Sequence, residues 1–310
     1  MLELFRKLPR RNYSKLLTLN LASVQQEKRH SHVKVVGAPD SERQFINAGV
    51  WRYQPVKKRF EVFAEGTSNP WGIDFNEYGH CFIEACVIPH LFHMIQGGRY
   101  QRQAGQHYAP TVEEAKRVAP AYFAQDFAPQ KGQPENSYTF KDAKVQPINP
   151  FIYDDLKTIA DHRHYLGATP HSGNARSDSA GGGHAHAGLM CYLGGSWPAE
   201  FTGKLIIGNI HGQRLNTDVP VRAGSGYVGK HAPDFINFND RWSQTLNQIY
   251  DHDGNVFIID WYDKQQCHSG NPAVHDRSNG RIFKISYGDT KTTKVDLAKA
   301  SDDELVKLLA

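Results

Sequence analysis

Histidine is the residue type in this chain best suited to chemistry, and it is concentrated in one part of the sequence. The chain has 310 residues and 16 histidines. Ten of these histidines lie in the stretch from His162 to His275. Imidazole changes its charge near neutral pH and is also a common metal ligand. This stretch could therefore hold a general base, a metal site or both.

The most informative motif is Gly-Gly-Gly-His-Ala-His-Ala-Gly at residues 181–188. Glycines allow positive φ and close approach of the backbone to a ligand, so Gly182 and Gly183 are candidate cofactor contacts. On an extended strand His184 and His186 would point to the same face. We expect one of them to act as a general base. A polar strand end whose histidines bond to loops would give the same pattern.

A second motif, Asn-Ile-His-Gly-Gln-Arg at residues 209–214, directly follows a predicted strand. An arginine at such a place can pair with a carboxylate, phosphate or quinone oxygen in a fork geometry. We predict His211 and Arg214 as catalytic residues, with Arg214 stabilising negative charge on the acceptor. Asn209 is a candidate cofactor contact. A salt-bridged loop is the alternative interpretation.

A third group follows the next predicted buried strand and contains Asp260, Asp263, His268 and His275. Carboxylates at a strand end can bind Ca²⁺ or orient a histidine, and together with imidazoles they can bind a transition metal. We predict a metal site from these four residues, although turn-forming aspartates would look the same. Arg281, which begins the following strand, is a candidate cofactor contact.

Two further stretches place histidines on loops. Asp161-His162-Arg163-His164-Tyr165 lies in a long polar loop, and such loops are often functional. We predict that His164 contacts a cofactor. His90 and His93 are three residues apart and could share a face, but a packed histidine is the simpler interpretation of His93.

The elements that must position these residues are short strands joined by tight turns. Residues 75–83 and 250–258 share one pattern: an aromatic residue, Asn or Asp, two residues, Gly, two residues, then Phe-Ile. Asn or Asp and Gly supply turn geometry between apolar flanks, which predicts strand, turn, strand. Residues 201–207 form a looser copy. A repeat of about 40–50 residues is the size of a propeller blade.

The predicted fold class is therefore all-β, a partial β-propeller with a short C-terminal helix. We expect a poorly defined segment at 1–44, blades at 45–290 with a Pro-rich insertion at 109–150, and the start of a helical region at 291–310. The capping box Ser301-Asp302-Asp303-Glu304 marks that helix. We count about four blades, the lower limit for a closed propeller, and expect the chain to be part of a larger architecture.

Composition and motifs exclude several classes of protein. The net charge is only +4, and no nucleic-acid-binding motif accompanies the scattered Lys and Arg residues, so we expect no nucleic-acid partner. No run of about 18 or more apolar residues predicts a membrane span. The four cysteines form neither CxxC nor CxxCH, which excludes a covalently held c-type haem. The N-terminal segment is not a convincing signal peptide.

Four long motifs of this chain resemble one known family. They are GTSNPWGIDF at 66–75, GGGHAHAG at 181–188, NIHGQRLN at 209–216, and the ending that runs from DWYD at 260 to NGRIFKISY at 279–287. Over residues 45–290 they resemble the propeller region of the membrane-bound dehydrogenases of planctomycete and verrucomicrobial (PVC) type, which bind haem. That family is distantly similar to glucose and sorbosone dehydrogenase propellers, with NHL-like blades.

The resemblance implies oxidation of a sugar or polyol in the periplasm or outside the cell. It implies a quinone of the PQQ kind, Ca²⁺ or a transition metal as cofactor, and a c-type haem domain outside this chain as electron acceptor. Fold-level similarity is weak evidence for function, so two alternatives stay open. One is a carbohydrate- or protein-binding scaffold, and the other is a metal-dependent hydrolase or lyase.

Overall fold

The computed structural model describes residues 48–54, 56–67, 69–86, 90–101, 153–165, 180–183, 185–265, 269–290 and 296–307, with short pieces at 17–18, 31–33, 35–39 and 44–46. This part of the chain is almost entirely β-structure, as predicted. Its strands are β1 (Leu17–Thr18), β2 (Ser31–Val33), β3 (Gln44–Ile46), β4 (Gly49–Gln54), β5 (Arg59–Gly66), β6 (Pro70–Phe75), β7 (Cys81–Ala85), β8 (Leu91–Met94), β9 (Gly98–Tyr100), β10 (Tyr153–Leu156), β11 (His186–Cys191), β12 (Leu205–Asn209), β13 (Arg214–Ala223), β14 (Gly226–Asn237), β15 (Thr245–Tyr250), β16 (Val256–Asp260) and β17 (Arg281–Ile285). Two 3₁₀ turns (Ala199–Phe201 and Pro272–Val274) and the helix α4 (Asp302–Lys307) complete it.

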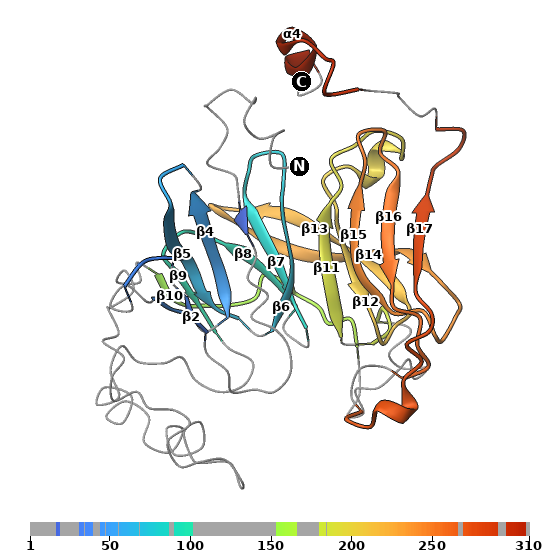
Figure 1. Ribbon diagram of the computed structural model, residues 1–310. Coiled ribbons are helices and arrows are strands. Elements are labelled where there is room, and N and C mark those ends of the chain that lie inside the picture. The colour runs from blue at the N-terminus through green and yellow to red at the C-terminus, as the bar shows by residue number, and fades with distance from the viewer. Residues whose placement is uncertain are drawn as a thin grey trace, which may run out of the picture.

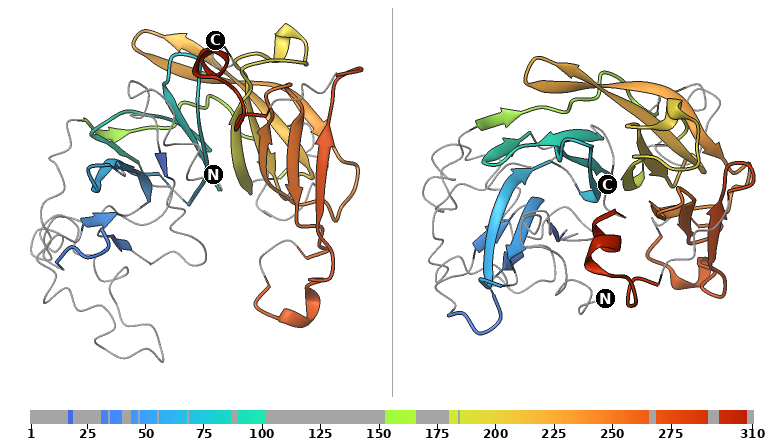
Figure 2. Two further views of the ribbon diagram at one scale, coloured as in Figure 1. Left: turned by 45° about the horizontal axis from the view of Figure 1, so that its top comes forward. Right: turned by 90° about the horizontal axis from the view of Figure 1, so that it is seen from above.

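The larger sheets follow one another around an open arc, as the blades of a propeller do (Figures 1 and 2). In chain order, the described part has the sheets β1-β4-β5-β9-β10, β6-β7-β8, β11-β12-β13-β14 and β15-β16-β17, with β2-β3 as a small extra pair. The strands β6, β11 and β15 begin three successive sheets, and β11 packs against both β6 and β15. Each of these three sheets then continues by antiparallel pairing. The predicted partial propeller is thus confirmed.

The hydrophobic core is divided into layers between neighbouring sheets. Phe82 and Leu91 pack against Leu205 and Ile207 of the next sheet. A second layer joins that sheet to β15-β16-β17. Because the middle sheets are covered on both faces, strands such as β12 are buried along their whole length. This explains their continuous apolar runs, which are typical of doubly covered strands.

The two predicted repeats are equivalent hairpin turns. Between β6 and β7, Gly79 N donates to Asn76 O at 2.8 Å. Between β15 and β16, Gly254 N donates to Asp251 O at 2.9 Å. Both glycines have positive φ, 75° and 82°, which is why glycine stands there. The looser copy also lies between two strands, β11 and β12, with Gly203 at φ 79°.

The remaining expectations about elements have mixed outcomes. Strand β17 lies at the edge of its sheet, and β4 lies between β1 and β5. Ser301 and Glu304 form the predicted capping box at α4, with Ser301 N donating to Glu304 Oε2 at 2.8 Å. The insertion at 109–150 lies outside the described residues. Among the helices that are described, none has the length and apolar character needed to cross a membrane.

Candidate metal centre

A short connector after β10 links two neighbouring blades. Ile159 N donates to Leu91 O at 2.9 Å, at the start of β8, and Gly229 N of β14 donates to Ile159 O at 2.7 Å. The connector therefore bridges the sheets that contain β8 and β14. It carries His162 and His164 into the joint between them.

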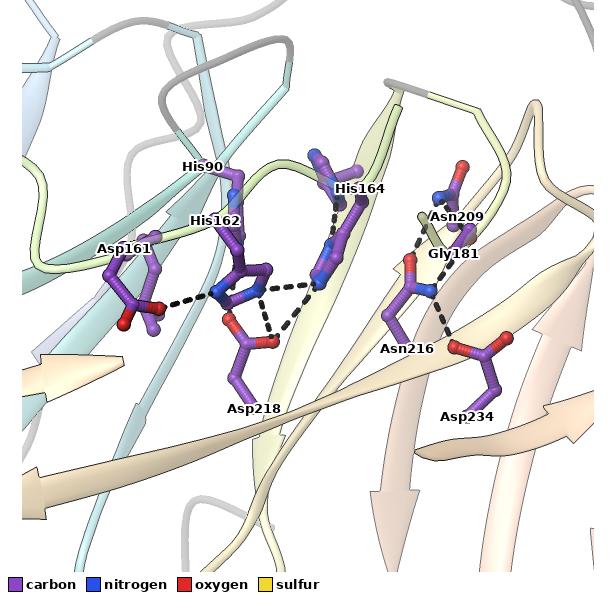
Figure 3. A network of polar contacts seen from close by, with 12 residues as sticks. His90, Asp161, His162, His164, Gly181, Asn209, Asn216, Asp218 and Asp234 are labelled. Carbon is purple, nitrogen blue, oxygen red and sulfur yellow. Dashed lines mark hydrogen bonds and ion pairs between the residues drawn. The ribbon is translucent and has the colours of Figure 1, made fainter. Parts of the chain in front are cut away.

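At this joint three histidines and one aspartate converge (Figure 3). Ligand atoms of His90, His162, His164 and Asp218 all lie within 4.8 Å of one another. His90 immediately precedes β8, and Asp218 is in β13. The His90, His164 and Asp218 side chains are fully buried, and His162 is largely buried. The group is thus assembled from three separate segments of the chain.

The carboxylate of Asp218 is the centre of the group. Its Oδ1 lies 3.0 Å from His162 Nε2 and 3.0 Å from His164 Nε2. Those two nitrogens are 3.1 Å apart. Its Oδ2 lies 2.8 Å from His90 Nε2. Both oxygens of one buried carboxylate are therefore surrounded by imidazole nitrogens.

Other polar residues surround this group. His164 Nδ1 is 2.8 Å from His186 Nε2, and His162 Nδ1 is 3.2 Å from Asp161 Oδ1. Asp161 also pairs with Lys230 of β14. The Nδ1 atoms of both histidines, which point away from Asp218, thus have polar partners of their own.

The local electrostatics suit a cation. Burial alone would raise the pKa of Asp218, but His164, His90 and His162 outweigh burial and hold this pKa well below its usual range. Burial, together with the nearby His90, lowers the pKa of His164 to about 3. An anionic carboxylate therefore faces a neutral imidazole. These are the ionisation states that metal ligands require.

The donor set favours a transition metal over Ca²⁺. Imidazole nitrogens suit Zn, Cu, Fe and Ni, whereas Ca²⁺ takes six to eight oxygen ligands. Within the described ranges, this is the one group of three or more His, Cys, Asp or Glu residues that converges closely enough to hold an ion.

Of the predicted catalytic histidines, His186 belongs to this region and His184 lies outside the described residues. His164, predicted as a cofactor contact, is a member of the group. His211 is buried and packs against Gly183, where an added Cβ would lie only 2.1 Å from the His211 Cβ. The glycine at 183 is therefore needed for close packing of two loops.

The two predicted cofactor loops do lie side by side. Asn209 Nδ2 donates to Gly183 O at 2.7 Å, and an added Cβ on Gly182 would lie 2.8 Å from Arg214 Nε. That Nε donates to Gly212 O at 2.8 Å.

Two more polar groups of these loops have partners. Arg214 Nη1 donates to Asp234 Oδ2 at 3.1 Å, and Asn209 Oδ1 accepts from Gly212 N at 2.9 Å. Because these groups already bond to one another, the loops as they stand do not fit a quinone held by Asn209 and Arg214.

Three of the four residues predicted to bind a metal after β16 are described, namely Asp260, Asp263 and His275. Asp260 accepts from Gln244 N at 2.6 Å and from Arg281 Nη2 at 2.6 Å. Asp263 accepts from Gln265 N at 2.9 Å, and its Oδ2 lies 3.4 Å from His275 Nδ1.

These aspartates organise the end of the strand and do not fit a Ca²⁺ site, because their oxygens already have donors. His268 lies outside the described residues. Arg281 also pairs with Asp240 and stacks 3.5 Å over the ring of Tyr262. Its contacts are those of a structural ion pair, so the predicted cofactor contact has no support here.

Sequence reasoning missed Asp218 and gave no role to His90. Asp218 lies inside a ten-residue strand and belongs to no recognisable motif. The feature that could have indicated Asp218 is a carboxylate that lies between buried residues in the middle of a strand. Such a residue needs a partner, since an isolated charge in the interior is very costly.

A comparison with models of protein families identifies the family of this chain. The chain belongs to the family described as a domain of unknown function, DUF7133, whose model matches residues 24–289. None of the curated proteins matches the sequence significantly.

The solved structures that this chain matches at low similarity include sugar dehydrogenases. A crystal structure of glucose dehydrogenase is 16% identical over 76% of this chain and 49% of its own, with a TM-score of 0.39. An oxidoreductase (glucose dehydrogenase) from Thermus thermophilus is 13% identical over 72% and 46%, with a TM-score of 0.36. The soluble aldose sugar dehydrogenase of Escherichia coli in the apo-form is 12% identical over 64% and 43%, with a TM-score of 0.35. This chain therefore spans about half the length of each of them or less.

Proposed function

We propose that this chain is the propeller portion of a metal-dependent oxidoreductase that oxidises a hydroxyl group of a sugar or polyol. The observation that supports this most directly is the buried group around Asp218, whose Oδ1 lies 3.0 Å from two histidine nitrogens. A transition ion held there would polarise a bound hydroxyl as a Lewis acid. The chain itself supplies the fixed anion and the imidazoles that would hold the ion.

The reaction must dispose of electrons as well as protons. Oxidation of a CH–OH group to C=O releases two electrons and two protons. The sequence contains no CxxCH for a covalent haem, so the proposal requires an acceptor of quinone or c-type haem kind on another domain or protein. The resemblance to PVC-type haem-binding dehydrogenases supports this division of labour. From the same resemblance we also propose that the blades span residues 45–290 and that the protein is periplasmic or extracellular.

The test is dye-linked oxidation of a panel of aldoses and polyols by the full chain. We expect turnover that is lost on chelation, restored by a divalent transition metal and absent in Asp218→Asn. His93→Gln is the matched control, because His93 is a partly buried histidine outside the group. Turnover that survives complete metal removal would refute the proposal.

Two other results would also overturn it and favour the alternatives. Cleavage of a substrate without reduction of the dye would indicate a metal-dependent hydrolase or lyase. Glycan binding without any turnover would indicate a recognition scaffold.

A further inference from the structure

The geometry around Asp218 points to a particular coordination mode. We infer that His162 Nε2, His164 Nε2 and Asp218 Oδ1 occupy one face of the coordination sphere of a six-coordinate, first-row divalent metal ion. Asp161 and His186 are the outer partners that orient the two histidines. This inference rests on the metal centre of the proposed function and specifies its ligands, but metal binding alone tests it.

The outer contacts decide where the ring protons lie. Asp161 Oδ1, 3.2 Å from His162 Nδ1, can only accept, so it keeps a proton on Nδ1 and leaves Nε2 as the nitrogen that would bind a metal. His164 Nδ1 lies 2.8 Å from His186 Nε2 and can donate its own proton to that nitrogen. With both protons on Nδ1, each Nε2 presents a lone pair toward Asp218. Metal-binding histidines are typically oriented in this way by an outer hydrogen bond.

Once neither Nε2 carries a proton, as metal binding requires, three lone-pair atoms meet. The distances are 3.0 Å from each nitrogen to Asp218 Oδ1 and 3.1 Å between the nitrogens. Electron-rich atoms at such distances in a buried site repel one another. A cation bound to all three atoms, to one side of the triangle that they form, turns this repulsion into attraction.

The size of the triangle indicates the coordination geometry. With metal–ligand distances of about 2.1 Å, neighbouring ligands are about 3.0 Å apart in an octahedron and about 3.4 Å apart in a tetrahedron. The observed edges of 3.0, 3.0 and 3.1 Å match the face of an octahedron. Two histidines and one carboxylate on one face leave the other positions open, as in non-haem Fe(II) sites.

His90 has a different role from the other two histidines of the group. Its Nε2 lies 2.8 Å from Asp218 Oδ2, the oxygen that faces away from His162 and His164. Donation of its Nε2 proton to that oxygen fixes the plane of the carboxylate. His90 is therefore a positioning residue rather than a fourth ligand.

Asp161 is the more readily tested of the two outer partners. It lies on the connector next to His162, is partly exposed and is paired with Lys230. Loss of an outer partner of this kind typically weakens metal binding 10–100-fold. Replacement of a true ligand should instead abolish binding within the measurable range.

The experiment is titration of the metal-stripped full chain with Co²⁺ and, without oxygen, with Fe²⁺. We expect one ion per chain and the weak visible absorption of six-coordinate Co²⁺. His162→Ala, His164→Ala and Asp218→Ala should lose binding. Asp161→Asn should bind 10–100-fold more weakly with the same spectrum, Asp161→Glu should recover part of the loss, and His93→Gln should match the wild type.

Several results would overturn the inference. These are the intense bands of tetrahedral Co²⁺, unchanged affinity in Asp161→Asn, or complete loss of binding in His90→Ala when its thermal unfolding matches the wild type. Thermal unfolding of every variant separates loss of the site from loss of the fold. Metal binding as expected without sugar oxidation would leave this inference standing and refute only the proposed function.

Discussion

At the residue scale, Asp218 shows how one buried charge organises a site. Its side chain is fully buried, yet its pKa is held low by the surrounding histidines. Removing one partner of a buried charge normally costs several kcal/mol. The histidines compensate for the burial of this anion, and the proposed cation would add to that compensation.

Glu84 is the opposite case, a fully buried carboxyl whose pKa burial raises well above its usual range. A carboxyl whose pKa is raised in the folded state stabilises the fold when it is protonated. This stabilisation is complete when the pH is below the pKa of the unfolded state, about 4.3, and is lost as the pH rises toward the pKa of the folded state. We therefore expect Glu84→Gln to be more stable than the wild type at pH 8 and to lose this advantage near pH 4. Urea unfolding at both pH values measures the difference.

Glu77→Gln is the control for this prediction, because Glu77 is exposed on the turn between β6 and β7. Its effect should be small at both pH values. An advantage of Glu84→Gln that does not change with pH would show that the wild-type carboxyl does not titrate as expected.

Single residues could be predicted from the sequence only where a local motif singled them out. His164 was recognised as a candidate because it lies in a histidine-rich loop. Asp218 was not, because its partners His90 and His164 are 128 and 54 residues away in the sequence. No spacing rule links residues that meet only when two blades pack.

At the element scale, the hairpin turns could be predicted because their geometry depends on nearby residues alone. The Asn or Asp and Gly of each repeat form the same hydrogen bonds in both copies. The connector after β10 could not be predicted in this way, because its hydrogen bonds go to β8 and β14.

Gly203 offers a clean test of turn strain. Its φ is 79°, and an added Cβ would have no neighbour within 4 Å. Gly203→Ala should lower the free energy of unfolding by about 1–2 kcal/mol, the cost of the left-handed conformation for an L-residue. Denaturant unfolding of Gly203→Ala and Gly270→Ala measures this.

Gly270 is the matched control, since it also has open space but no positive φ. Gly254→Ala should cost more than Gly203→Ala, because its Cβ would lie 2.4 Å from Ser196 N. Equal effects of the Gly203 and Gly270 substitutions would contradict the assigned turn.

The connector should also influence the metal centre. Thr158 Oγ1 donates to Leu91 O at 2.7 Å, next to His90. Thr158→Val keeps the shape of the side chain but removes this bond, worth about 1 kcal/mol. We expect metal affinity to fall severalfold, measured by Co²⁺ titration. An unchanged affinity would show that the connector does not set the position of His162 and His164.

At the scale of the whole molecule, the arc of blades could be predicted from the repeat, whereas the location of the centre could not. The length of the repeat indicated a propeller. The candidate metal centre lies at the joint of the β6-β7-β8 and β11-β12-β13-β14 sheets. Its proposed ligands come from β13 and from the connector, which is hydrogen-bonded to both sheets. A metal there should therefore hold two blades together.

This role predicts that metal removal lowers the stability of the whole fold. A ligand present at 100 times its dissociation constant stabilises the folded state by about 2.7 kcal/mol. Chelation should lower the urea midpoint of the wild type accordingly, and should leave the midpoint of Asp218→Asn unchanged. A wild-type urea midpoint that does not change on chelation would contradict the proposal that the metal holds the two blades together.

The measurement that tests the central claim most directly is a crystal structure of the metal-loaded chain, recorded at the absorption edge of the metal. We predict one anomalous difference peak at full occupancy, about 2.1 Å from His162 Nε2, His164 Nε2 and Asp218 Oδ1. A fully loaded crystal with no peak there, or with its peak beside Asp260 and Asp263, would contradict the account.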